Sequence, residues 1–121
     1  MKLAIPSETN QELKSIRSGH FGRAPYFTLA TIENDKITSI EAVKNVEHDE
    51  VGCAGVVEFA ASLGIDAILV VGMGQPPFMR FSNLGIEVYA ETETPLVGDV
   101  LAKFVAGAVD KMDPQAACNH H

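Results

Sequence analysis

The segment 18–27, SGHFGRAPYF, carries the side chains with the clearest chemical potential in this sequence. A neutral histidine ring nitrogen binds transition metals, and imidazole exchanges protons near neutral pH. The guanidinium of arginine holds a carboxylate or phosphate through two parallel hydrogen bonds. His20 and Arg23 therefore predict a site for a metal or a small anion, although a surface histidine and a surface salt bridge are the simpler interpretations.

The charge distribution also points to a small anionic ligand. The 121-residue chain has a formal net charge of -7, which disfavours non-specific binding to nucleic acid or to an anionic membrane. No Asp or Glu occurs from Leu13 to Ala24, whereas Lys14, Arg17 and Arg23 fall there together with His20. This local excess of positive charge fits an anion site, and it equally fits a solvated loop.

The two cysteines and the two histidines at the end of the sequence supply further candidate metal ligands. Cys53 follows Gly52 at the start of a predicted helix, where the helix dipole favours a thiolate that can bind a soft metal cluster. A small buried residue is the alternative for Cys53. The ending CNHH places Cys118, His120 and His121 together, either as ligands for a transition metal or as a chain end without such a role. Neither cysteine belongs to a CxxC pair, which disfavours structural zinc.

A second glycine-bearing loop, GMGQPP at 72–77, follows the most apolar predicted strand. Gly72 and Gly74 allow close approach to a ligand, and the helix after them is expected to offer N–H groups to an anion. The dinucleotide pattern G-x-G-x-x-G fails because Pro77 stands at its last position, and a plain strand-to-helix turn is the alternative. No arrangement of Ser, His and Asp or of paired carboxylates stands out, so we expect a protein without catalytic activity.

The hydrophobic pattern predicts how these segments are positioned. We expect strands at 2–7, 65–72 and 86–91, a hairpin over 26–43 with its turn at 34–36, helices at 53–64 and 94–112, and a loop with a short helix at 73–85. Thr94 is the expected N-cap of the last helix and Pro95 its first residue. This order predicts an α/β fold in which a mixed five-stranded sheet carries helices on both faces.

The length suits one domain, which we place at 1–112, followed by a flexible Cys- and His-containing tail at 113–121. No apolar run approaches the roughly 20 residues of a membrane-spanning helix, and the start is too weakly apolar for a secretory signal. We therefore expect a cytoplasmic protein with no membrane or nucleic-acid partner.

Three stretches together resemble the dinitrogenase iron–molybdenum cofactor biosynthesis domain. They are SGHFGRAPYF, GCAGVVEFAASLGIDAILVVGMGQPPFMRFSNLGIEVYAE and the amphipathic helix that follows. This NifX-like group also includes NafY and the carboxy-terminal part of NifB. The resemblance extends from Met1 to about Val109.

The resemblance implies a three-layer, ribonuclease-H-like α/β fold without nuclease activity. It implies binding of the iron–molybdenum cofactor or its iron–sulfur precursor, which is carried between cofactor-assembly proteins of nitrogen fixation. We expect a monomer or weak homo-oligomer. His20 matches the histidine of the HFG motif and is the implied cluster contact, and Arg23 would face the anionic cluster or its organic acid. The alternative is a module that binds a small phosphate or carboxylate metabolite through loops 18–23 and 72–77.

The candidate residues follow from these arguments. Ligand binding is assigned to His20, Phe21, Gly22, Arg23, Cys53, Gly72 and Gly74, and metal binding to His20, Cys53, Cys118, His120 and His121. Phe21 is expected to pack beneath its loop. A permanent cluster protein typically supplies four cysteines, whereas this chain has two, and such a sparse ligand set suits a carrier that releases its cargo.

Overall fold

The computed structural model describes residues 1–46 and 48–112, with side chains except at 48–51 and 53. The elements in order are β1 (Lys2–Ser7), the 3-10 turns η1 (Glu12–Lys14) and η2 (Phe21–Arg23), β2 (Tyr26–Glu33), β3 (Lys36–Lys44), α1 (His48–Ser62), β4 (Ala67–Val70), α2 (Gln75–Asn83), β5 (Glu87–Ala90), α3 (Val97–Val105) and β6 (Asp110–Lys111). The predicted tail at 113–121 lies outside the described residues. Within the described part, no helix has the length and apolar character needed to cross a membrane.

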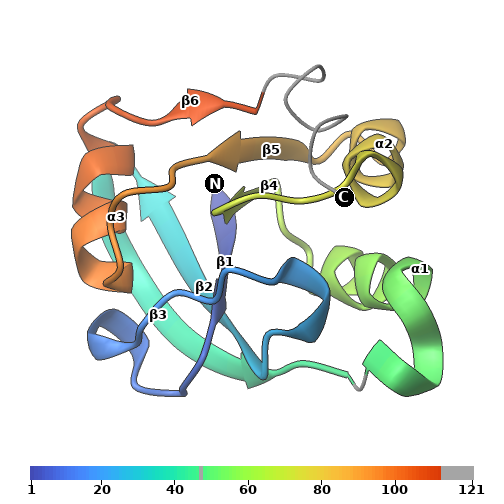
Figure 1. Ribbon diagram of the computed structural model, residues 1–121. Helices are drawn as coiled ribbons and strands as arrows, with labels where there is room; N and C mark the ends of the chain where they lie inside the picture. Colours follow the sequence, from blue (N-terminus) through green and yellow to red (C-terminus); the bar gives the residue numbers. More distant parts are fainter. Residues whose placement is uncertain (47, 113–121) are drawn as a thin grey trace.

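The strands form one mixed sheet in the order β3-β2-β1-β4-β5-β6, as Figure 1 shows. The three central strands β1, β4 and β5 are parallel, and β2, β3 and β6 each run antiparallel to the strand they join. The mixed α/β class is confirmed, but the number of five strands is wrong because of the short edge strand β6. The ribonuclease-H-like identity stays a prediction.

Helices cover both faces of the sheet, which confirms the three-layer arrangement. On one face, α1 and α2 bury an apolar cluster that includes Val56, Val57, Phe78 and Phe81. On the other face, α3 packs on the sheet through a second cluster. That cluster comprises Leu3, Ile5, Ala30, Ile32, Ala67, Leu69, Val97, Val100, Leu101 and Val109. Because successive strand residues point to opposite faces, the continuous apolar run of β4 feeds both clusters.

The predicted hairpin is confirmed by the pairing of β2 with β3. Asn34 and Asp35 at its tip have φ values of 53° and 62°. Left-handed backbone at two successive positions is the geometry that matches the twist of a tight hairpin, and Asn and Asp tolerate it better than most residues. The hairpin therefore follows from the local sequence.

The last helix is shorter than predicted. It spans Val97–Val105 rather than 94–112, and Leu96 occupies the N-cap position instead of Thr94. Residues 94–96 are not helical, since the Pro95 carbonyl accepts a hydrogen bond from the Arg17 amide (2.8 Å) and the extended Leu96 forms an antiparallel bridge with Ile16. At its other end, Gly107 has a φ of 78°, after which the chain returns to the sheet as β6.

The first long helix begins earlier than predicted. We expected linker up to 52 and a helix at 53–64, whereas α1 spans His48–Ser62 with a break at Gly52. Gly52 has φ 69° and ψ -179°, so helical geometry starts anew after it. This conformation strongly favours glycine, and it divides α1 into a short polar segment before Gly52, which we predicted as linker, and the predicted helix after it.

Gly98 in α3 lies against the backbone of η1 (Glu12–Lys14). A Cβ at this position would approach the Leu13 carbonyl oxygen to 2.9 Å, which is closer than real Cβ atoms come. The absence of a side chain thus lets the loop after β1 sit directly on α3.

We predict that Gly98→Ala destabilises the protein by about 1–2 kcal/mol, even though alanine favours a helix by roughly 1 kcal/mol over glycine. Chemical denaturation measures the difference. Gly19→Ala is the control, since a Cβ there would meet no atom within 4 Å. Equal stability of the two variants would contradict the close approach.

Candidate functional site

Several loops converge at one edge of the sheet. The strands β1 and β4 are parallel neighbours, so the chain leaves both at the same edge. The antiparallel strand β2 begins there as well, so the loop that carries η2 enters the sheet at the same edge at which the chain leaves β4. Phe21 of η2 shares an apolar cluster with Met73, which lies between Gly72 and Gly74. The two loops predicted to bind a ligand therefore border the same edge of the sheet and the same apolar cluster, and a ligand site shared by them stays a prediction.

The loop 18–25 is held at both ends. At its start, the Ser18 amide donates to the Pro6 carbonyl (2.9 Å). At its end, the buried Asn45 makes two hydrogen bonds to the loop. Its side-chain Nδ2 donates to the Ala24 carbonyl (2.8 Å), and its backbone N–H donates to the Pro25 carbonyl (2.9 Å). A loop fixed in this way presents its side chains in a defined arrangement, which lowers the entropy lost when a ligand binds.

The side chains of η2 divide between the core and the solvent. Phe21 is 4% exposed and meets the ring of Phe81 edge to face, with centroids 5.3 Å apart, so the prediction that it packs beneath the loop is confirmed. His20 and Arg23 on either side of it are exposed, and Gly22 is half-buried. The aromatic ring thus anchors a short turn whose imidazole and guanidinium reach the surface.

Arg17 does not belong to this exposed positive surface, contrary to the sequence interpretation. Its side chain is 2% exposed and donates from one guanidinium nitrogen to Glu91 Oε1 (2.8 Å) and to the Thr94 carbonyl (2.9 Å). The other nitrogen donates to the Glu91 carbonyl (2.8 Å). Burial lowers the pKa of Arg17, and hydrogen bonding and charge attraction from Glu91 counteract this effect. The residue is a structural cation rather than part of a ligand site.

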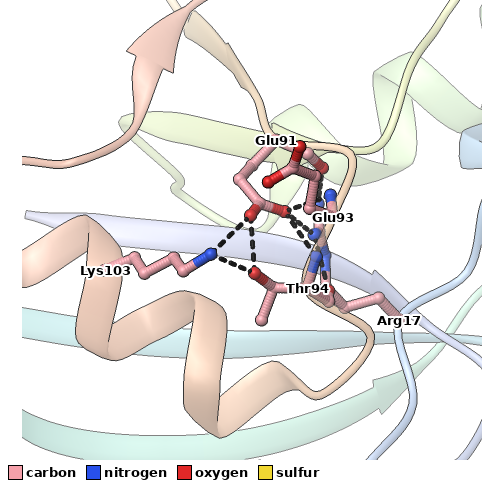
Figure 2. Close-up of polar contacts among 5 residues, drawn as sticks. All are labelled: Arg17, Glu91, Glu93, Thr94 and Lys103. Carbon is pink, nitrogen blue, oxygen red and sulfur yellow. Dashed lines mark hydrogen bonds and ion pairs between the residues drawn. The ribbon is translucent and has the colours of Figure 1, made fainter.

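Glu91 is the centre of this cluster, which we call the Glu91 clasp and which consists of Arg17, Glu91, Thr94 and Lys103 (Figure 2). Lys103 Nζ donates to Glu91 Oε2 (3.1 Å) and to Thr94 Oγ1 (2.6 Å). Desolvation raises the pKa of Glu91, but hydrogen bonds from Thr94, Lys103 and Arg17 outweigh it and bring the pKa to about 2. The clasp ties the loop after β1 to the turn between β5 and α3.

The glycine loop after β4 offers less to an anion than predicted. Gly74 is the N-cap of α2, and Gln75 is followed by Pro76 and Pro77 in the first turn. Proline has no N–H, so two positions that would normally donate to an anion cannot do so. Gly72 and Gly74 remain half-buried beside Met73. The expectation of a helix N-terminus rich in N–H donors is therefore wrong here.

The remaining candidate ligands fall beyond what the structure describes. The side chain of Cys53 and the tail residues Cys118, His120 and His121 lie outside the described residues. Among the described side chains, no three from His, Cys, Asp and Glu are grouped closely enough to hold a metal ion. Within the described part, His20 is the predicted metal ligand with a defined position.

Sequence reasoning missed the Glu91 clasp. Arg17 and Glu91 lie 74 residues apart, and no local pattern pairs them. A local signal exists only for Glu91 and Thr94, because a carboxylate three residues before a threonine readily accepts hydrogen bonds from its backbone N–H and its hydroxyl. Here the Thr94 backbone N–H donates to Glu91 Oε1 (3.0 Å).

Comparison with known proteins adds the family context. A family model described as dinitrogenase iron-molybdenum cofactor matches residues 1–107. An uncharacterized protein of Methanocaldococcus jannaschii is 32% identical over 117 residues, covering 93% of this chain and 92% of its own. The crystal structure of PH0822 has a TM-score of 0.80 at 29% identity, covering 93% of this chain and 96% of that chain.

A further neighbour shares the fold at lower sequence similarity. It is the apo form of the orange protein from Desulfovibrio gigas, with a TM-score of 0.77 at 22% identity and 92% of each chain covered. Together these matches span nearly the whole described chain.

We predict that Glu91→Gln lowers the free energy of unfolding by about 2–4 kcal/mol, because it leaves the buried Arg17 guanidinium without its counter-charge. Urea denaturation at neutral pH measures this change. Glu87→Gln is the matched control, since the Glu87 side chain is 45% exposed in its ion pair with Lys111. A loss no larger than the control's would contradict the structural role of the clasp.

The clasp also predicts acid sensitivity. The pKa of Glu91 is about 2 in the folded protein, below the ordinary 4.5, so the ionised carboxylate contributes its full stabilisation of the fold above pH 4.5. This stabilisation is lost as the pH falls through 4.5 towards 2, and it amounts to about 2–3 kcal/mol. We expect Glu91→Gln to show a correspondingly flatter stability curve in that window. Parallel curves for the variant and the original protein would contradict the assignment.

Proposed function

The chain belongs to the dinitrogenase iron–molybdenum cofactor family, and from this we propose that it is a non-catalytic carrier of an anionic metal cluster. The cargo is the iron–molybdenum cofactor or an iron–sulfur precursor, and the contact is the loop His20–Arg23. The partners are the proteins that assemble the cofactor. The observation that carries the proposal is an exposed imidazole and guanidinium on a loop fixed at both ends.

The charges on this loop suit a negatively charged cargo. The protein as a whole is acidic, so an anionic cluster is repelled unless a local cationic site exists. Arg17 is neutralised by Glu91, whereas Arg23 is an exposed cation on one side of Phe21 and His20 is exposed on the other side. A guanidinium binds cluster sulfides or a carboxylate of an organic acid through charge-assisted hydrogen bonds.

The imidazole of His20 supplies the metal ligand in this proposal. One exposed nitrogen ligand gives weak and reversible attachment, which is what transfer between assembly proteins requires. Cys53 and the tail residues Cys118, His120 and His121 are the further ligands that the chain can bring to the cargo. Thiolate and imidazole are suitable donors for iron in such clusters.

We predict that anaerobic incubation with iron and sulfide loads the protein with a cluster, seen as charge-transfer absorption, and that His20→Ala weakens loading several-fold. Lys14→Ala is the matched control, since Lys14 is an exposed residue of the same acid-free segment outside the fixed loop. Loading of His20→Ala at the level of the original protein would remove His20 from the site.

A second candidate function is binding of a small phosphate or carboxylate metabolite at the same edge. The exposed Arg23 favours it, whereas the prolines at the start of α2 weaken it. Thermal-shift assays with inorganic phosphate and with citrate separate the two functions. Stabilisation that Arg23→Ala abolishes, in a protein that takes up no cluster, would favour the metabolite.

A further inference from the structure

The strand β3 forms one edge of the sheet, and within the part of the chain that the structure describes it pairs with β2 on one side only (Figure 1). The opposite edge is the two-residue strand β6, so β3 is the long free edge. Five of the six residues from 36 to 41 are exposed, and Ile40 is half-buried. A free edge of this length offers backbone N–H and C=O groups to a further strand.

Hydrogen bonds at both ends of β3 show which of its residues turn their backbone groups outward. The Asn45 N–H donates to the carbonyl of the residue before β2 (2.9 Å), so the backbone of Asn45 faces β2. Every second residue of an antiparallel strand faces the same neighbour, and Ile40 therefore faces away from β2. Ile32 of β2 exchanges hydrogen bonds with Met1 (2.7 and 2.9 Å) and faces β1, so its partner Ile37 also faces outward.

A β-bulge brings these two isoleucines onto one face of the sheet. The register between β2 and β3 shifts by one residue, so that Ile37 lies opposite Ile32 and Ile40 lies opposite Ala30. Ile32 and Ala30 both belong to the cluster beneath α3, and directly opposed residues share a face. Without the extra residue, two side chains three positions apart would point to opposite faces.

The same bulge brings two opposite charges onto the other face. Lys36 lies opposite Glu33, and Glu41 lies opposite Leu29, which belongs to the cluster beneath α1 and α2. Because Glu33 and Leu29 are four residues apart on β2, they point to the same face. Lys36 and Glu41 are exposed, and neither makes an ion pair among the described residues.

Together these features define one self-complementary register for two copies of β3. When the two strands run antiparallel about a two-fold axis through the bulge, Ile37 opposes Ile40 of the second copy, and their outward backbone groups can exchange hydrogen bonds. Lys36 then opposes Glu41 of the second copy on the other face. A lysine and a bulge usually discourage pairing at an edge, but here the second copy supplies the counter-charge. Backbone direction, side-chain face and charge therefore select the same register.

We propose that β3 is the interface of a weak homodimer, in which residues 36–41 of two copies pair antiparallel and join the two sheets. The paired stretch is short compared with the ~800 Å² that each partner contributes to a stable complex, so the dimer dissociates on dilution. The pairing leaves out the loop 18–25, which meets β3 at Asn45. The proposal is therefore independent of the proposed function.

Sedimentation equilibrium of the full chain, from micromolar to millimolar concentration, tests the dimer. We expect Lys36→Glu and Glu41→Lys each to weaken association roughly tenfold, because each variant places like charges opposite one another. We expect an equimolar mixture of the two variants to regain association, since each strand then meets the opposite charges. An original protein that stays monomeric at millimolar concentration would overturn the proposal, and so would a mixture no more associated than its components.

The matched control is Lys44→Glu, which makes the same change of net charge on the same strand outside the paired stretch. We expect this variant to associate like the original protein. If it weakened association as much as Lys36→Glu, net charge rather than pairing would control the dimer, and the proposal would be rejected. Amide spectra of the three variants check that the fold is retained.

Isotope-filtered NOE spectra of a mixture of ¹³C-labelled and unlabelled protein locate the interface. We expect contacts between the methyl groups of Ile37 in one copy and Ile40 in the other. The chain also exposes Leu13, Ile16 and Leu96 on the loop after β1 and before α3. Contacts between copies through those side chains, and not through β3, would place the interface elsewhere and overturn the proposal.

Discussion

The buried ion pair between Arg17 and Glu91 is the constraint on which the site edge depends. A guanidinium that is 2% exposed must have its charge and its donors satisfied, and Glu91 with the carbonyls beside it satisfies them. Because Arg17 directly precedes the loop 18–25, the same contacts fix where that loop leaves the sheet. The stability of the fold and the starting point of the loop that carries His20 therefore both depend on this ion pair.

The clasp also changes how the positive segment 13–24 is understood. The side chains of this segment lie in different places. Arg17 is buried in its ion pair with Glu91, whereas His20 and Arg23 are exposed on either side of the buried Phe21. In the proposed function, His20 and Arg23 give an acidic protein a small site for an anion. This separation fits a ligand that is compact and anionic better than an extended polyanion.

The sequence predicted those features that local patterns determine. The hairpin with its Asn34–Asp35 turn, the doubly buried β4 and the stop of α2 before Gly85 follow from periodicity and turn chemistry, and all appear in the structure. The start of α3, the strand β6 and the partner of Arg17 depend on segments far away in the chain. Pro95 is a good first helical residue by itself, but its carbonyl is taken by the Arg17 amide, so the helix starts later. For the site, the sequence predicted correctly that Phe21 packs beneath its loop, and the ligand role of His20 stays a prediction. The sequence could not show that Arg17 is internal.

The position of β1 in the middle of the sheet has a consequence for how the chain folds. One side of β1 pairs with β2 across a connection of moderate length, and the other pairs with β4, where Leu3 lies opposite Ala67. Pairing β1 with β4 costs more conformational entropy than pairing it with β2, because the chain between β1 and β4 is longer. This entropy is lost before most of the stabilising contacts have formed. The β1–β2–β3 meander can therefore form before β4 has paired with the free edge of β1. During synthesis, the backbone groups on this open edge of β1 are available to pair with another nascent chain until β4 has joined the sheet.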